Sequence, residues 1–246
     1  MTSTSKPKVL TYALPPTKLI PNSPHVLIHY PGLLTSLVKN KSFSTNQVFD
    51  LFASNGWQTQ WIARYGPNQN SHYHSGAHEC MAVISGGRAQ IRFGVADSEE
   101  DRAQDLGLGT AGKDVNAEGR EQGGILLDAE VGDVFILPAG VAHKTHNPLP
   151  PTDGIVFYQP PDKRDEKGCR EFFAGVPIEG EFMMMGAYPR GDEWDFAIGG
   201  EHEGRFGEVW GLRCRRGILC LGRVWRGWLG FGVQGTSLDC RRCCYG

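Results

Sequence analysis

The sequence predicts an all-β domain, preceded by an extended arm and one short helix. From Trp57 onward, short apolar runs alternate with Gly, Pro, Asn and Asp, which is typical of strands joined by turns. The first 30 residues are rich in Pro, Ser and Thr, and a single amphipathic stretch follows them. Because 246 residues are enough for a real core, one β domain is the most economical interpretation.

Residues 1–30 include "LPPTKLIPNSP", so we expect an extended arm with isolated pairing. The stretch "STNQVFDLFASNGW" then predicts a short helix with an apolar stripe at i, i+3 and i+4. The stripe consists of Val48, Leu51 and Phe52. Ser44 or Thr45 can cap the start of this helix, and Asn55-Gly56 is a stop signal.

The main domain is expected over residues 31–200. Its predicted strands lie at 57–65, 79–86, 88–95, 124–131, 133–140 and 154–160. Several short strands at this spacing indicate an antiparallel sandwich or barrel. An acidic insertion at 97–122 carries eight acids and three bases with few large apolar residues, so we interpret it as a solvated loop rather than a partner-binding segment. We interpret residues 160–173 as a charged connector.

The charge is unevenly distributed along the chain. Residues 211–246 contain seven arginines and one acid, so residues 1–210 carry −8 of a total of −2. An acidic body argues against a nucleic-acid partner. Since no run of 18 apolar residues exists and the first residues lack a signal-peptide layout, we expect no membrane partner and a cytoplasmic location.

Residues 201–246 form an atypical basic tail that we place outside the fold. The tail has no steady period and is dense in Arg, Gly, Cys and Trp, so we hypothesise a gene-model artefact, with a genuine basic tail as the alternative. Five of the seven cysteines lie there, but no pair of CxxC knuckles at a workable spacing supports a zinc site. The other two, Cys80 and Cys169, are expected to be reduced thiols.

Two histidines and a glutamate form the first half of a candidate metal site. In an extended segment, side chains alternate between faces, so His72 and His74 point the same way and Tyr73 points away. Ser75-Gly76 permits a turn that can return Glu79 to the same place. Imidazole and carboxylate together suit a divalent metal ion.

A fourth ligand is expected from "GDVFILPAGVAHKTHN". Its Pro-Ala-Gly turn leaves His143 near the start of a new strand, and alternation turns Lys144 and His146 to the other face. We interpret the other histidines, His25, His29, His146 and His202, as structural. The role of His78 stays open, since alternation should direct it away from the metal.

These residues match two spaced motifs, G-x5-HxH-x4-E-x6-G and G-x5-PxG-xx-H-xxx-N. The ten fixed positions are Gly66, His72, His74, Glu79, Gly86, Gly132, Pro138, Gly140, His143 and Asn147. The chain therefore resembles the cupin superfamily, whose fold is also called RmlC-like. It is similar in particular to the YjlB-like cupins through "IPNSP", "LFASNGW", "HYHSGAHE", "LPAGVAHK" and "GAYPRGDEWD", over roughly residues 10–200.

The resemblance implies a double-stranded β-helix, a jelly-roll barrel, with a metal in its mouth bound by His72, His74, Glu79 and His143. This ligand set leaves coordination positions open, and it lacks the thiolates of a closed zinc site. Fe(II), Mn, Ni and Zn all remain possible. Because the ligands must be deprotonated, metal affinity should fall below about pH 6.

Three functions fit this site. The first is a metal-dependent oxidoreductase, dioxygenase-like, that acts on a small molecule. The second is a non-catalytic cupin that binds a small ligand or a metal, and the third is a metal-dependent isomerase. Fold alone decides among none of them. The catalytic residues are unknown, and Tyr65, Arg64, Arg92 and Lys144 are candidates only by proximity in sequence; a homodimer is left open.

Overall fold

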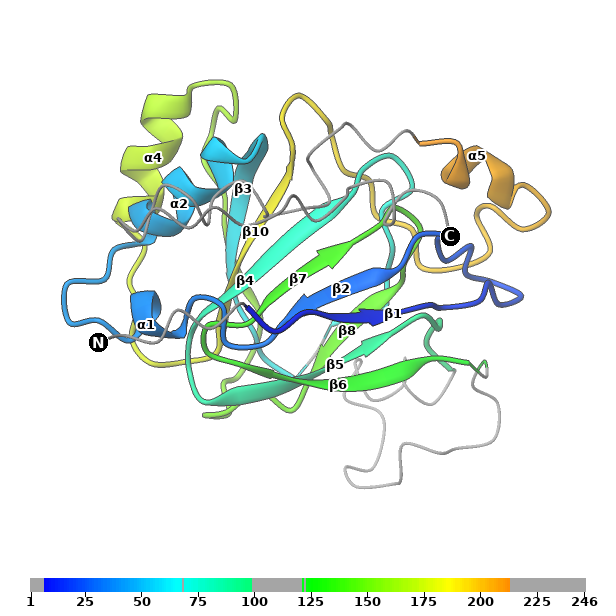
Figure 1. Ribbon diagram of the computed structural model, residues 1–246, viewed down its shortest axis with the longest axis horizontal. Helices are drawn as coiled ribbons and strands as arrows, with labels where there is room; N and C mark the ends of the chain where they lie inside the picture. The colour runs from blue at the N-terminus through cyan, green and yellow to red at the C-terminus, as the bar shows by residue number, and fades with distance from the viewer. Residues whose placement is uncertain (1–6, 68, 99–120, 122, 213–246) are drawn as a thin grey trace.

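The computed structural model describes residues 7–67, 69–98, 121 and 123–212. Within these residues the chain forms two antiparallel sheets that do not join into a closed barrel (Figure 1). The large sheet has the strand order β1-β2-β7-β4-β10-β3-β9, and the small sheet has the order β6-β5-β8. The prediction of a sheet-rich, antiparallel fold is confirmed at this level.

The strands of the large sheet are β1 (Leu10–Tyr12), β2 (Leu27–Tyr30), β3 (Trp57–Arg64), β4 (Glu79–Ser85), β7 (Val134–Leu137), β9 (Val156–Tyr158) and β10 (Met183–Pro189). Those of the small sheet are β5 (Arg88–Phe93), β6 (Ile125–Glu130) and β8 (His143–His146). Each of the six predicted strand segments contains one of these strands. The prediction that His143 begins a new strand is also confirmed.

Strand β10 was not predicted from the sequence, although it lies at the centre of the large sheet between β3 and β4. All seven of its residues are buried. A strand that is covered on both faces has no alternation of apolar and polar residues, so the period that identifies half-buried strands is missing.

The N-terminal segment takes part in the large sheet. Strand β2 lies between β1 and β7, with Ile28 opposite Ile136. All four residues of β2 are buried. The segment expected as an extended arm therefore supplies two strands, β1 and β2.

Helix α2 (Thr45–Ser54) confirms the predicted helix and its cap. The Ser44 side chain accepts a hydrogen bond from the backbone N–H of Asn46 (3.3 Å), and the Gln47 side chain accepts one from the backbone N–H of Ser44 (3.0 Å). This reciprocal pair is a capping box, which satisfies two N–H groups that the first turn leaves without partners. A shorter helix, α1 (Thr35–Val38), precedes α2.

The interpretation of residues 160–173 as a connector is wrong for most of the segment, because helix α4 (Glu166–Ala174) lies there. Its buried residues, Cys169 and Phe173, are spaced i, i+4 and share one face of the helix. Helix α4 packs on α2, and the Thr45 hydroxyl donates a hydrogen bond to the Phe173 carbonyl (2.8 Å). An apolar stripe of two residues within a charged run was too weak a signal on its own.

Two large apolar clusters hold the fold together, and a smaller third one includes Tyr73 and Ala197. One lies between the helices and the outer face of the large sheet and includes Phe52, Trp57 and Phe173. The other lies between the two sheets and includes Trp61 and Phe135. Burial of one such side chain stabilises the fold by about 1.5–3 kcal/mol.

The last helix, α5 (Phe206–Trp210), also contacts the body of the protein. The Val209 side chain is buried, and the Trp210 indole donates a hydrogen bond to the Pro21 carbonyl (3.1 Å). The rest of the predicted tail, 213–246, lies outside the described residues, as does most of the acidic insertion.

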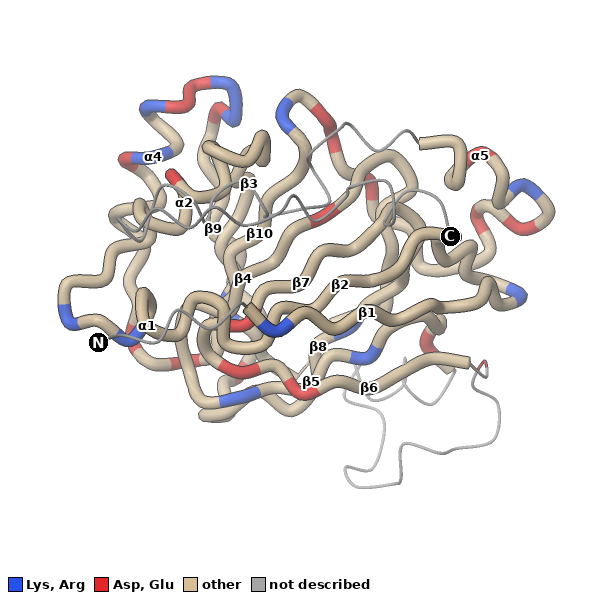
Figure 2. The backbone as a smooth tube through the Cα atoms, viewed as in Figure 1, with Lys and Arg blue, Asp and Glu red and all other residues tan. Residues whose placement is uncertain are grey.

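Charged residues gather on α4, on turns and near α5, while the central strands of the large sheet carry few of them (Figure 2). Among the described helices, none has the length and apolarity to cross a lipid bilayer.

We expect Phe173→Ala to lower the free energy of unfolding by about 3–5 kcal/mol, because the substitution opens a cavity between α2 and α4. Urea denaturation measures this change. Phe172→Ala is the matched control, since Phe172 is the neighbouring residue on the same helix and is only partly buried. Equal losses in the two variants would contradict the packing described for α4.

Candidate metal centre

Backbone pairing brings His72 next to His143. The N–H of His72 donates to the carbonyl of His143 (3.2 Å), and the N–H of His143 donates to the carbonyl of His72 (2.8 Å). Two residues after His72, the carbonyl of His74 accepts a hydrogen bond from the N–H of Gly140 (2.8 Å). Gly140 has φ +88°, a conformation that favours glycine, so the turn before β8 depends on this residue.

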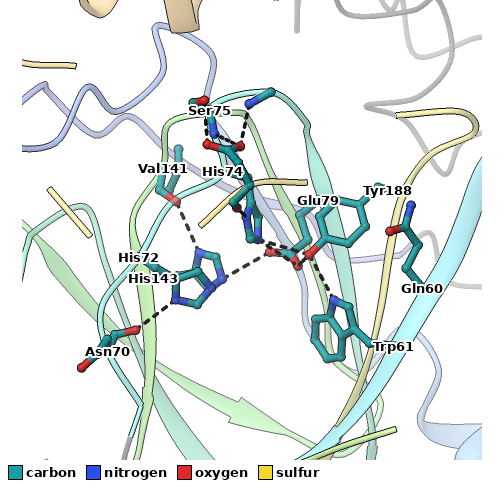
Figure 3. A network of polar contacts seen from close by, with 12 residues as sticks. Gln60, Trp61, Asn70, His72, His74, Ser75, Glu79, Val141, His143 and Tyr188 are labelled. Atoms are coloured by element: carbon teal, nitrogen blue, oxygen red, sulfur yellow. Dashed lines mark hydrogen bonds and ion pairs between the residues drawn. The ribbon is translucent and has the colours of Figure 1, made fainter. Parts of the chain in front are cut away.

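The three imidazoles converge in the interior (Figure 3). Each of His72, His74 and His143 offers a nitrogen within 4.8 Å of those of the other two, and all three side chains are buried. The ring centroids of His72 and His143 lie 4.3 Å apart. Three buried histidines in this arrangement could hold a metal ion.

Each ring is oriented by a backbone carbonyl that faces its Nδ1 atom. The acceptors are Asn70 O for His72 (3.0 Å), Val141 O for His143 (3.4 Å) and Asp195 O for His74. A carbonyl can only accept, so Nδ1 carries a proton, and in the neutral ring the lone pair lies on Nε2. Histidines that bind metal ions are commonly oriented in this way.

The carboxylate of Glu79 lies against two of these rings. Its Oε1 atom is 3.5 Å from Nε2 of His74, and its Oε2 atom is 3.3 Å from Nε2 of His143. Oε1 accepts a hydrogen bond from the Tyr188 hydroxyl (2.6 Å), whereas Oε2 is buried and has no hydrogen-bond partner among the described residues. A buried polar atom without a partner is costly, and a cation between the rings would satisfy it, so the donor set fits a metal ion.

The pKa shifts of most of these groups favour the deprotonated form, which is the form that binds a metal ion. Burial raises the pKa of Glu79, but the charges of His74 and His143 outweigh it and lower the pKa to about 2. Burial lowers the pKa of His143 to about 4, and burial together with the neighbouring imidazoles lowers that of His72 well below its usual value. For His74, burial lowers the pKa but the Glu79 carboxylate more than offsets this, so the pKa is raised.

A second segment, residues 195–197, contacts residues 72–75, which include two of the histidines. The Asp195 carboxylate accepts hydrogen bonds from the backbone N–H and the hydroxyl of Ser75 (both 2.7 Å). The Phe196 ring stacks on the ring of His72, with centroids 4.1 Å apart, and Ala197 pairs with Tyr73. These contacts set the positions of His72 and His74, and no spacing rule in the sequence links residues so far apart.

His78 does not belong to the three-histidine group. Its Nδ1 atom accepts a hydrogen bond from the backbone N–H of Ala139 (3.0 Å), and its side chain is buried. Two of the histidines interpreted as structural have partners elsewhere. His29 pairs with Asp133 (3.0 Å), and His202 contacts the Tyr73 hydroxyl (2.8 Å).

Of the four residues named as candidates by sequence proximity, one lies within electrostatic range of Glu79. Arg92 and Lys144 both contact Asp97, at 2.6 and 3.2 Å, and Arg64 lies 3.8 Å from Glu181. Tyr65 belongs to the core between the sheets, and burial together with the charge of Glu79 raises the pKa of its hydroxyl. The hydroxyl that contacts Glu79 belongs instead to Tyr188, a residue in the part of the sequence whose strand was not predicted.

Comparison with models of known protein families and with curated proteins found no match. The cupin resemblance therefore remains a prediction from the motifs, and the geometry of the site carries the functional argument.

We expect the metal-free protein to lose stability as the pH falls from 6.5 to about 4. The unfolded chain protonates His143 near pH 6.5, whereas the folded protein resists protonation down to about pH 4, so acid favours unfolding by about 3 kcal/mol over this window. His72 acts in the same direction, and His74, whose pKa is raised, offsets part of the effect.

Urea denaturation of chelator-treated protein at pH 7 and pH 5 measures this loss. His143→Asn should lose about 2 kcal/mol less than the wild type between these two values, because it lacks the group whose pKa is lowered. Parallel pH profiles of the two proteins would show that His143 is not responsible.

Proposed function

We propose that this protein binds one divalent metal ion through Nε2 of His72, His74 and His143 and a carboxylate oxygen of Glu79, and that it oxidises a small molecule there. The observation that carries the proposal is the cluster of three buried imidazoles, with the Glu79 carboxylate against two of them and its Oε2 atom, 3.3 Å from Nε2 of His143, without a hydrogen-bond partner among the described residues. When bound, the ion would supply Lewis-acid or redox chemistry at the coordination positions that four ligands leave open.

The donor set narrows the kind of metal. Three imidazoles and a carboxylate, without a thiolate, are unlike the ligands of a closed structural zinc site. The same donors suit Fe(II), Mn, Ni or catalytic Zn. We propose a dioxygenase-like oxidoreductase within this set.

We also propose that the fold is the cupin jelly roll. Two antiparallel sheets with an apolar cluster between them are compatible with that fold, and all ten motif positions are present in the sequence. The candidate ligands lie at one end of the space between the sheets, where β4 and β8 begin.

The chain's own residues would orient the ligands and exclude water. Each ligand side chain is nearly inaccessible, with exposed fractions of 1% for Glu79 and 6% for His72. Phe196 covers the His72 ring, and Trp61 and Tyr188 lie behind Glu79. Electrostatic interactions are stronger in such a dry site than in water.

A non-catalytic protein that binds a metal or a small ligand is the second candidate. The observation in its favour is that Lys144, which could have moved a proton in a reaction, is held by Asp97 (3.2 Å). An isomerase depends on such proton transfer, so the same observation weakens the third candidate.

We expect the purified wild-type protein to bind a stoichiometric amount of Fe(II), Mn, Ni or Zn, measured by elemental analysis after reconstitution. His74→Ala and His143→Ala should each lose at least about 10-fold in affinity, because each removes a ligand. His25→Ala is the matched control, since His25 lies outside the cluster. Full metal occupancy in both ligand variants would refute the assignment.

The metal-loaded protein should consume oxygen with at least one member of a panel of small organic acids, phenols and thiols, and His74→Ala should not. An oxygen electrode measures this uptake, with His25→Ala as the positive control. Tight metal binding without uptake on any substrate would favour the non-catalytic candidate.

A further inference from the structure

The Tyr188 hydroxyl lies at the junction of three side chains in the candidate centre (Figure 3). It is 2.6 Å from Oε1 of Glu79 and 3.2 Å from Nε2 of His74, and it accepts a hydrogen bond from the indole N–H of Trp61 (3.1 Å). An indole nitrogen can only donate, so the phenol must direct its own proton to another partner. The shorter contact, to Glu79, takes that proton.

The two oxygens of Glu79 therefore have different surroundings. Oε1 is occupied by a short hydrogen bond from Tyr188. Oε2 lies 3.3 Å from Nε2 of His143 and has no hydrogen-bond donor among the described residues. Oε2 is therefore the oxygen that a cation would satisfy, whereas Oε1 already has a donor.

We infer that Tyr188 is a positioning residue that holds Glu79 in a one-oxygen binding mode, in which Oε2 alone faces the metal. This inference rests on the proposed metal binding. A carboxylate that bound through both oxygens would take a coordination position that the one-oxygen mode leaves to a substrate. Tyr188 would thus determine how many positions remain for chemistry.

The surroundings of Tyr188 restrict its movement. Its ring stacks on Trp194, with centroids 5.9 Å apart and an angle of 15° between the planes. Its oxygen is held by Trp61, whose ring packs so closely over Gly186 that a Cβ atom there would overlap it. The register of β10 on β3 shifts at Gly186, leaving Gln60 as an extra residue opposite it. A bulge of this kind re-aims the side chains that follow, and here it directs Trp61 toward Tyr188.

Tyr188→Phe tests the inference, because it keeps the ring and removes only the hydroxyl. We would load the full chain with Co²⁺ and measure the dissociation constant and the visible absorption spectrum, which depends on the number and arrangement of the ligands. The spectrum of the variant should change because Oε1 becomes free to bind, and its dissociation constant should change by up to about 10–100-fold because a contact that orients a ligand is lost.

Tyr30→Phe is the matched control. Tyr30 is also a buried tyrosine, but it belongs to the apolar cluster between the helices and the large sheet, which contains none of the candidate ligands. Its Co²⁺ affinity and spectrum should equal those of the wild type. If Tyr188→Phe does not fold, Trp61→Phe replaces it, because this substitution removes the hydrogen bond that holds the phenol. The same two measurements then test the inference.

The outcomes separate the inference from the proposed function. A wild-type protein that binds no Co²⁺ would overturn the metal site itself. Wild-type binding with an unchanged spectrum in Tyr188→Phe, whether or not the affinity falls, would overturn only the positioning role. A changed spectrum in Tyr188→Phe and an unchanged one in Tyr30→Phe would establish that role.

Discussion

The candidate centre depends on one local interaction, the pair of backbone hydrogen bonds between His72 and His143. These bonds place two imidazoles from segments far apart in the chain directly across from each other. Without the backbone bonds, rotation of the side chains alone would not keep the two rings together. The surrounding structure holds this pair in place from both sides. Strand β8 holds His143 in the small sheet, and residues 195–197 hold residues 72–75 in place. A metal site built on strand pairing is more rigid than one built on loops.

That arrangement leaves the metal-free fold with an electrostatic cost. Three imidazoles and a carboxylate are buried together, and Oε2 of Glu79 lacks a donor among the described residues. An unsatisfied buried polar atom costs about 1–3 kcal/mol, and an ion that binds only the folded chain would recover this and add its own binding free energy. Stability and metal binding are therefore coupled, and the coupling acts through the same few atoms.

The sequence was sufficient to predict the parts of the structure that carry a local pattern. The cap and stripe of α2 and the six strand segments have such patterns, and His72, His74 and His143, which the structure brings together, belong to two spaced motifs. Strand β10 escaped prediction because it is buried throughout and shows no alternation, and α4 because two apolar residues among charges are a weak stripe. The contacts of Tyr188 and Asp195 with the centre follow from tertiary packing alone, since more than 100 residues separate them from Glu79 and Ser75.

The site thus has two parts with different origins. The histidines and Glu79 come from compact motifs, and their chemistry limits which ions can bind. Residues 183–197 first form β10, inside the large sheet, and then cross residues 72–75. They therefore connect the packing of the core to the orientation of the ligands. A substitution of a core residue that packs against β10 would move Trp61 and Tyr188 before it moved any ligand. In the proposed metal site, the histidines and Glu79 would determine which ion binds, and residues 183–197 would determine which coordination positions stay open.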